Sequence, residues 1–285
     1  MTVTIIANNR TTTVADGSSI FVSGFGDTLF TNDSSITFGD DSNVQVNGNN
    51  NQLTLGSGTT VVASGQGDSA TVTGTNDQVS GAASVTLTGT GSSALDVTLE
   101  VGANANVNAS GSTITINDNS TVSIVGNNDQ IATSAASGGA TTVRLNGTGD
   151  VVTDSAFALS GQMQLTNGAP SNAGPTNELA LGTPGGPVSD TQLWFQASGN
   201  DLKIELLGTQ NEVTVANWFA SPGNQLQAIH AGGMTLDNGA VGQLVQAMAT
   251  FAAANPGFDP TSASGAGLAH NDPGVQTAIV AAWHG

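Results

Sequence analysis

Aspartate recurs at one position of a six-residue phrase, Gly-x-(Gly/Asn)-(Asp/Asn)-x-apolar, in the first half of the chain. The phrase returns roughly every two dozen residues, at 24–29, 48–53, 74–79, 102–107 (a weaker copy), 126–131 and 147–152. Its acidic members are Asp27, Asp77, Asp129 and Asp150. Carboxylate and backbone carbonyl oxygens are the ligands that calcium takes in proteins. The aspartates therefore predict calcium sites, provided that the fold stacks them about 5 Å apart.

A structural interpretation competes with calcium. Gly, Asn and Asp suit sharp corners because they tolerate positive φ better than other residues. Asn51 and Ala105 occupy the same position of the phrase and interrupt the column of charge. Asp129 and Asp150 form the best candidate pair, because nothing neutral stands between them in the series. The sequence leaves both interpretations open.

The elements that must position these residues are short strands. Each repeat contains three apolar couples that alternate with polar residues, for example Leu53/Leu55, Val61/Ala63 and Ala70/Val72. Alternation with a period of two residues predicts strands with one buried face. Strands this short must pair with their equivalents in neighbouring repeats. We therefore predict an all-β fold, a three-sided β-solenoid of about seven coils over residues 1–167. A two-sided roll with turns of about 18 residues is the competing geometry.

The second half of the chain differs in pattern. Residues 168–190 are rich in Pro and Gly and predict a linker. Residues 191–254 predict a small β-meander followed by a helix with Val241, Leu244, Val245, Met248 and Phe251 on one face. In the tail, residues 255–285, Asp272-Pro273 predicts the start of another helix, with Asp as N-cap and Pro at the first position.

Composition excludes several classes of partner. The chain has 3 basic and 21 acidic residues, a formal net charge of -18. Nucleic-acid binding is not expected, because phosphates are contacted by Lys and Arg. There is no run of apolar residues long enough to predict insertion into a membrane. The N-terminus has neither the basic nor the apolar region of a secretory signal peptide.

A resemblance is carried by the string LWFQASGNDLKIELLGTQNEVTVANWF at 193–219, followed by Gly233-Met-Thr-Leu-Asp-Asn238. Residues 191–254 resemble the haemolysin-type calcium-binding-related module of repeats-in-toxin proteins. The resemblance implies export from a Gram-negative bacterium by type I secretion machinery, with an uncleaved signal in the tail. It also implies an extracellular or cell-surface location, and calcium at Asp27, Asp77, Asp129 and Asp150.

Catalysis is not predicted. The three histidines are scattered, Tyr and Cys are absent, and Arg10 and Arg144 fall in different repeats. A cleft that cleaves acidic polysaccharides would need basic residues to stabilise developing negative charge. We expect a non-enzymatic protein, with a polysaccharide-binding or polysaccharide-cleaving β-helix protein as the alternative.

The first residues predict an interaction edge. A strand pattern begins at Thr2, and its apolar residues are Val3, Ile5 and Ile6. An open strand edge invites pairing with another chain, and a head-to-tail contact that does not close gives a filament. The expected function is therefore that of a secreted structural protein, a solenoid rod that self-assembles into fibres or a surface layer, as in a biofilm matrix.

Overall fold

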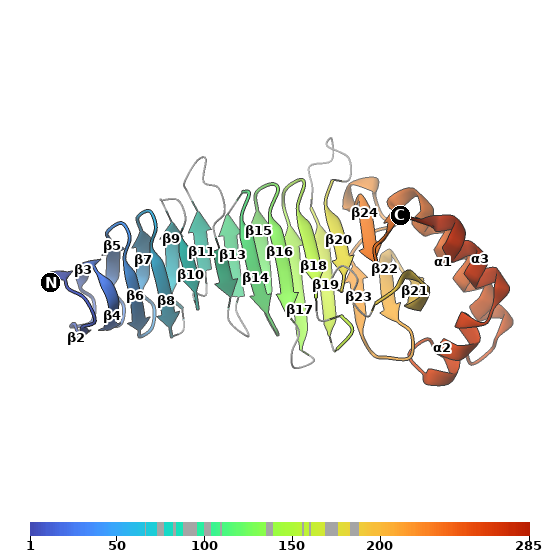
Figure 1. Cartoon of the computed structure of the whole chain (residues 1–285), viewed down its shortest axis with the longest axis horizontal. Coiled ribbons are helices and arrows are strands. Elements are labelled where there is room, and N and C mark those ends of the chain that lie inside the picture. The colour runs from blue at the N-terminus through green and yellow to red at the C-terminus, as the bar shows by residue number, and fades with distance from the viewer. Residues whose placement is uncertain are drawn as a thin grey trace. The chain divides into compact units, whose positions relative to one another are not determined.

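The structure is a computed structural model of the whole chain, coloured along its length in Figure 1. It forms two compact units, Met1–Ile131 and Ala132–Gly285. The residues that it describes are 1–65, 67–72, 77–81, 84–87, 96–99, 104–108, 110–134, 139–155, 157–159, 161–168, 176–182 and 188–285.

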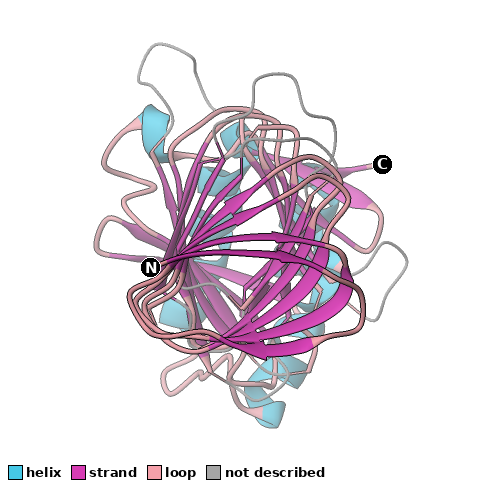
Figure 2. Ribbon diagram, turned by 90° about the vertical axis from the view of Figure 1, so that its left-hand side faces the viewer, coloured by secondary structure: helices cyan, strands magenta, loops and turns pink. Residues whose placement is uncertain are grey.

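The first unit consists of two parallel sheets whose strands alternate along the chain (Figure 2). Sheet A contains β1 (Thr2–Ile6), β3 (Ser19–Ser23), β5 (Ser35–Phe38), β7 (Gln52–Leu55), β9 (Ser69–Val72), β11 (Ser84–Leu87), β13 (Asn104–Asn108) and β15 (Thr121–Val125). Sheet B contains β2 (Thr11–Thr13), β4 (Phe25–Phe30), β6 (Asn43–Asn47), β8 (Thr60–Ser64), β10 (Gln78–Ser80), β12 (Asp96–Leu99) and β14 (Thr113–Asn117). β16 (Gln130–Ser134) spans the boundary between the units.

The predicted β-solenoid is confirmed, but three sides is wrong: each coil has two strands, one in each sheet. The third apolar couple of a predicted repeat begins the next coil instead of closing a third side. Leu53 of β7 thus pairs in register with Ala70 of β9, within sheet A. Ser35, Gln52 and Ser69 follow one another in that register, a step of 17 residues each time (35 to 52 to 69).

The core of the first unit is the space between the two sheets. Inward side chains such as Ile36, Leu53 and Val61 are fully buried, and each such side chain contributes about 1.5–3 kcal/mol relative to an exposed one. Outward positions are polar. Thr37, Thr54 and Thr71 occupy one outward column of sheet A, an alignment that the assumed repeat of two dozen residues had concealed.

The second unit continues the same alternation. Its parallel strands are β17 (Ala140–Leu145), β18 (Val151–Asp154), β19 (Gln162–Asn167) and β20 (Glu178–Leu181). β20 lies inside the predicted linker, which is a correction. Its sequence Glu-Leu-Ala-Leu alternates polar or small residues with leucine and buries both leucines, so the pattern was present but short.

The predicted meander extends these sheets. β23 (Glu212–Val215) pairs in parallel with β19, and β22 (Asp201–Leu206) and β21 (Leu193–Ser198) follow in antiparallel order. In the other sheet, β24 (Ala228–Ala231) pairs with β20, followed by β25 (Met234–Asp237) and β26 (Trp283–His284). The 3-10 turns η1 (Asp190–Gln192) and η2 (Pro222–Asn224) complete the connections.

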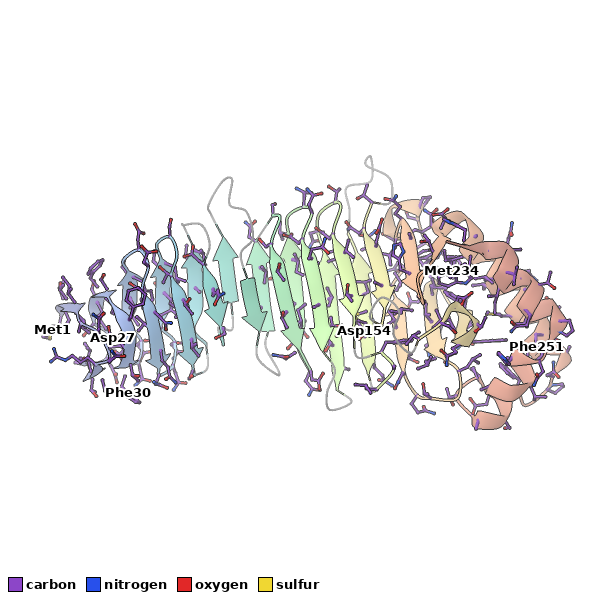
Figure 3. The ribbon with its side chains drawn as sticks, in the orientation of Figure 1. Met1, Asp27, Phe30, Asp154, Met234 and Phe251 are labelled. Carbon is purple, nitrogen blue, oxygen red and sulfur yellow. The ribbon has the colours of Figure 1, made fainter. Side chains whose placement is uncertain are left out.

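Three helices cover the end of this unit: α1 (Asn238–Ala254), α2 (Ala263–His270) and α3 (Pro273–Ala282). Four of the five apolar residues predicted on one face of α1 are buried, including Phe251, labelled in Figure 3, whereas Val245 is half-buried. Asp272 caps α3 as predicted, because its carboxylate accepts the N–H of Val275 at 2.9 Å. α2 was not predicted from the sequence. None of the helices in the described part of the chain has the length and apolar character needed to cross a membrane.

Candidate functional site: the corner caps of the coils

The four predicted calcium ligands are all buried, at the starts of sheet B strands. Asp27 lies in β4 (Figure 3), and Asp77, Asp129 and Asp150 immediately precede β10, β16 and β18. Asn51, which belongs to the same phrase, precedes β7 in sheet A instead. The single column expected from the phrase is therefore wrong, because the phrase marks corners of both sheets.

Asp27, Asp77 and Asp129 each accept a backbone N–H of the preceding coil. The Oδ1 atom of Asp27 accepts the N–H of Arg10 at 2.9 Å, and that of Asp77 accepts the N–H of Thr59 at 2.8 Å. Asp129 accepts the N–H of Ser112 at 2.9 Å. We call such a side chain, which closes the corner of the coil before it, a corner cap.

Corner caps also include residues outside the predicted calcium ligands. Along sheet A the N–H of Ser18 donates to Ser34 Oγ at 3.1 Å and that of Ser34 to Asn51 Oδ1 at 3.2 Å. Asn51 N–H in turn donates to Asp68 Oδ1 at 2.7 Å. Ser, Asn and Asp thus perform the same task in successive coils. The shared property is a short side chain with an acceptor oxygen.

The positive-φ interpretation of the four aspartates is also wrong. The residue with positive φ is the preceding one in the cases that the structure describes, for example Gly26, Asn128 and Gly149. The residue with positive φ turns the chain. The side chain of the aspartate that follows it then points inward, towards the corner of the preceding coil. A buried N–H without an acceptor costs about 1–3 kcal/mol, so each cap makes an otherwise unfavourable corner tolerable.

In an aspartate cap, the second carboxylate oxygen is unfavourably placed for a charged group. Oδ2 of Asp27, Asp68 and Asp77 is buried and makes no hydrogen bond. At the equivalent position Asn51 donates its Nδ2 to the carbonyl of Thr31 at 3.1 Å, which an ionised carboxylate is unable to do.

Burial accordingly raises the pKa of three of the aspartate caps. Loss of solvation is the largest cause for Asp68, Asp77 and Asp129, and the backbone hydrogen bond to each opposes it. The negative charge of Asp40 raises the pKa of Asp77 further. The folded protein therefore binds a proton at each of these three caps more tightly than the unfolded chain does.

The described residues do not bring the predicted calcium ligands together. No group of three or more His, Asp or Glu side chains in the described part of the chain could hold a metal ion. Asp77 caps neutral Thr59, and Asp129 caps neutral Ser112. Asp129 and Asp150 belong to different units. Calcium, which takes six to eight oxygen ligands, stays a prediction.

A second polar group lies on the outward face of the second unit. His230 contacts Glu178 (Nε2 to Oε2, 3.1 Å) and Thr235 (Nδ1 to Oγ1, 3.2 Å) on the two flanking strands. A pocket of 350 Å³ lies beside it, lined in part by Thr153, Ala180 and Met234. Sequence spacing gave no signal for this group, because its members come together only through pairing of β20, β24 and β25.

No known family model matches the chain. The resemblance of residues 191–254 to the repeats-in-toxin module therefore stays a prediction.

Proposed function

We propose that the chain is a non-enzymatic structural protein of the bacterial exterior, whose β-solenoid associates with further copies through β1 and β2. The observation that carries this proposal is that β1 and β2 each pair with a neighbouring strand on one side only. Within the described residues, β1 pairs only with β3 and β2 only with β4. Each strand therefore presents a row of N–H and C=O groups that can pair with another chain.

The apolar residues of the first coil support the same proposal. Val3 is half-buried, whereas Ile20 and Ile36, which follow it in register, are fully buried. The difference arises because every inner coil is covered on both sides. Ile6 points outward and is 77% exposed. A second copy over this coil would cover Val3 and part of Ile5.

The use of the acidic residues supports a structural role. At least six of the aspartates in the coils accept a backbone N–H from a neighbouring coil and so hold it in place. Their carboxylates are thus engaged in maintaining the stack. We propose calcium as an additional stabiliser outside the cell, where it would offset the repulsion within a chain of net charge -18.

We expect Thr4→Pro to weaken self-association by at least about tenfold, which corresponds to about 1.4 kcal/mol. In the parallel ladder, Ala7 N–H donates to Ser23 and Met1 C=O accepts from Ser19, so the odd-numbered residues face β3. The N–H of Thr4 faces away, and proline there removes an outward donor while leaving the pairing with β3 intact. Sedimentation over a range of concentrations measures the effect. An unchanged melting temperature shows that the fold is retained.

The contradicting result is a wild-type chain that sediments as a monomer at every concentration. Equal association of the wild type and Thr4→Pro would also contradict pairing through β1. Lysine at Ile5 would be a poor test, because Ile5 points inward and is only 8% exposed. Its replacement would damage the core itself.

Export by type I secretion is proposed from the resemblance of the C-terminal module. We expect a chain lacking residues 226–285 to stay inside the cell and a chain lacking residues 1–51 to be exported, because the implied signal lies in the tail. The measurement is the amount of each chain in the medium of a host that carries the secretion machinery. Appearance of the shortened C-terminal variant outside intact cells would refute the proposal.

A further inference from the structure

We infer that the docking partner at this edge is a second copy placed head-to-head, with β1 against β1 and β2 against β2 of the other chain. The assembly then closes as a two-fold dimer instead of growing as the head-to-tail fibre expected from the sequence. This inference rests on the proposed function, since it specifies how the self-association through β1 and β2 takes place.

Head-to-tail growth would need an open edge at the other end of both sheets, and in sheet A the helix α1 covers that edge. β21 is the last strand of its sheet, and α1 packs against it (Figure 1). The backbone N–H of Phe195 in β21 donates to the sulfur of Met248 in α1 at 3.0 Å. β26, the last strand of the other sheet, contains only Trp283 and His284 and directly follows α3.

The edge of β1 is complementary to itself. The N–H and C=O groups of Thr2, Thr4 and Ile6 face away from β3, as the alternation of the ladder requires. An antiparallel copy of the same strand presents acceptors to these donors and donors to these acceptors. A two-fold axis through the Thr4 pair would use the same surface twice, which is the property of an interface that closes.

The charges near β2 favour this pairing over a second antiparallel arrangement, in which β1 would pair with β2 of the other copy. Arg10 is the single basic residue among residues 1–131, and it immediately precedes β2, whereas Asp16 follows β2. Both side chains are exposed. When β2 pairs antiparallel with its own copy, Arg10 of one chain comes beside Asp16 of the other. Pairing of β1 with β2 of the other copy would instead bring Arg10 to Arg10 and Asp16 to Asp16.

Cysteine cross-linking tests the arrangement directly, because the chain contains no cysteine. Three single variants, Thr2→Cys, Thr4→Cys and Ile6→Cys, place a thiol along the outward face of β1. The control is Thr37→Cys, in the same outward column but two coils away from the edge. Directly opposed residues of antiparallel strands lie within reach of a disulfide.

We expect Thr4→Cys to give at least about tenfold more disulfide-linked dimer than Thr37→Cys under mild oxidation. A dimer formed through Thr2→Cys or Ile6→Cys would place the two-fold axis elsewhere on β1 and still support the head-to-head arrangement. If the full chain associates but none of the three β1 variants cross-links above the control, the head-to-head arrangement is wrong and the proposed function stands. If the wild-type chain does not associate at all, both fail.

Discussion

Replacing Gly48 by alanine is expected to destabilise the protein by about 3 kcal/mol or more, at the upper end of the cost of overpacking. Gly48 has φ +144°, and a Cβ there would lie 1.8 Å from the carbonyl oxygen of Thr31 in the preceding coil. The obstacle is backbone that is hydrogen-bonded between coils, through Thr31 N–H to Asn47 and Gly48 N–H to Ser64. The neighbour therefore has no room to move without opening the stack.

The control for Gly48→Ala is Gly17→Ala. Gly17 also has positive φ, +70°, but a Cβ there would meet no atom within 4 Å. Only the backbone preference is lost, which costs about 1–2 kcal/mol. The free energy of unfolding in urea is measured for both variants. The difference between the two losses is the cost of the clash between coils, because Gly17→Ala carries only the cost of the backbone conformation. Equal losses for the two variants would contradict the two-sheet stacking described here.

Asp77→Ala and Asp77→Asn are expected to differ in stability by about 1–3 kcal/mol, the cost of leaving a buried donor unpaired. Alanine leaves the N–H of Thr59 without its acceptor. Asparagine keeps an acceptor oxygen, as Asn51 does at a corner of sheet A. Its amide would also replace the buried Oδ2 that has no hydrogen bond in the wild type. We therefore expect Asp77→Asn to be as stable as the wild type or more so at neutral pH.

The same pair of variants has a pH signature. The pKa of Asp77 is raised above 3.8 in the folded chain, mainly by burial. The folded state therefore binds the proton more tightly than the unfolded state, and stability increases as the pH falls from 7 through the raised pKa towards 3.8. Asp77→Asn lacks this group, so its stability should depend less on pH over that window. A steeper dependence than that of the wild type would contradict burial of an ionised cap.

Calcium gives these variants a further readout. If Asp77 is only a corner cap, the wild type and Asp77→Asn respond equally to calcium and to a chelator. If Asp77 also binds calcium, the wild type melts at a higher temperature with calcium, and Asp77→Asn loses part of that increase, because the loss of a charged ligand weakens a calcium site. Melting curves of both chains with calcium and with chelator separate the two outcomes.

Most of the strands, though not β20, and two of the three helices could be predicted because their signals are local. Alternating couples such as Leu53/Leu55 identified strands correctly, and the Asp272-Pro273 pair identified the start of α3. Their grouping into coils was not local. The sheet A caps Ser34, Asn51 and Asp68 are equivalent in space but differ in residue type. The repeat recognised in the sequence therefore followed residue identity. The repeat of the coils in the structure follows the presence of a side-chain acceptor oxygen at the corner.

The role of the aspartates was hidden for a related reason. Sequence spacing indicates which residues recur, but it does not show which of two adjacent residues turns the chain and which points inward. At Asn128-Asp129 the first has positive φ and the second is the cap. The positive-φ interpretation gave Asp129 the task of its neighbour Asn128, and only the register between coils resolves the two roles. Calcium binding at Asp129 stays a prediction.

Amide hydrogen exchange at Thr4 is the measurement that tests association through β1 most directly. Thr4 N–H faces away from β3, so it should exchange rapidly at low protein concentration and slowly at high concentration, when another chain accepts its hydrogen bond. Ile5 N–H faces β3 and should be protected at both concentrations. Rapid exchange of Thr4 at every concentration, with Ile5 protected throughout, would contradict the account.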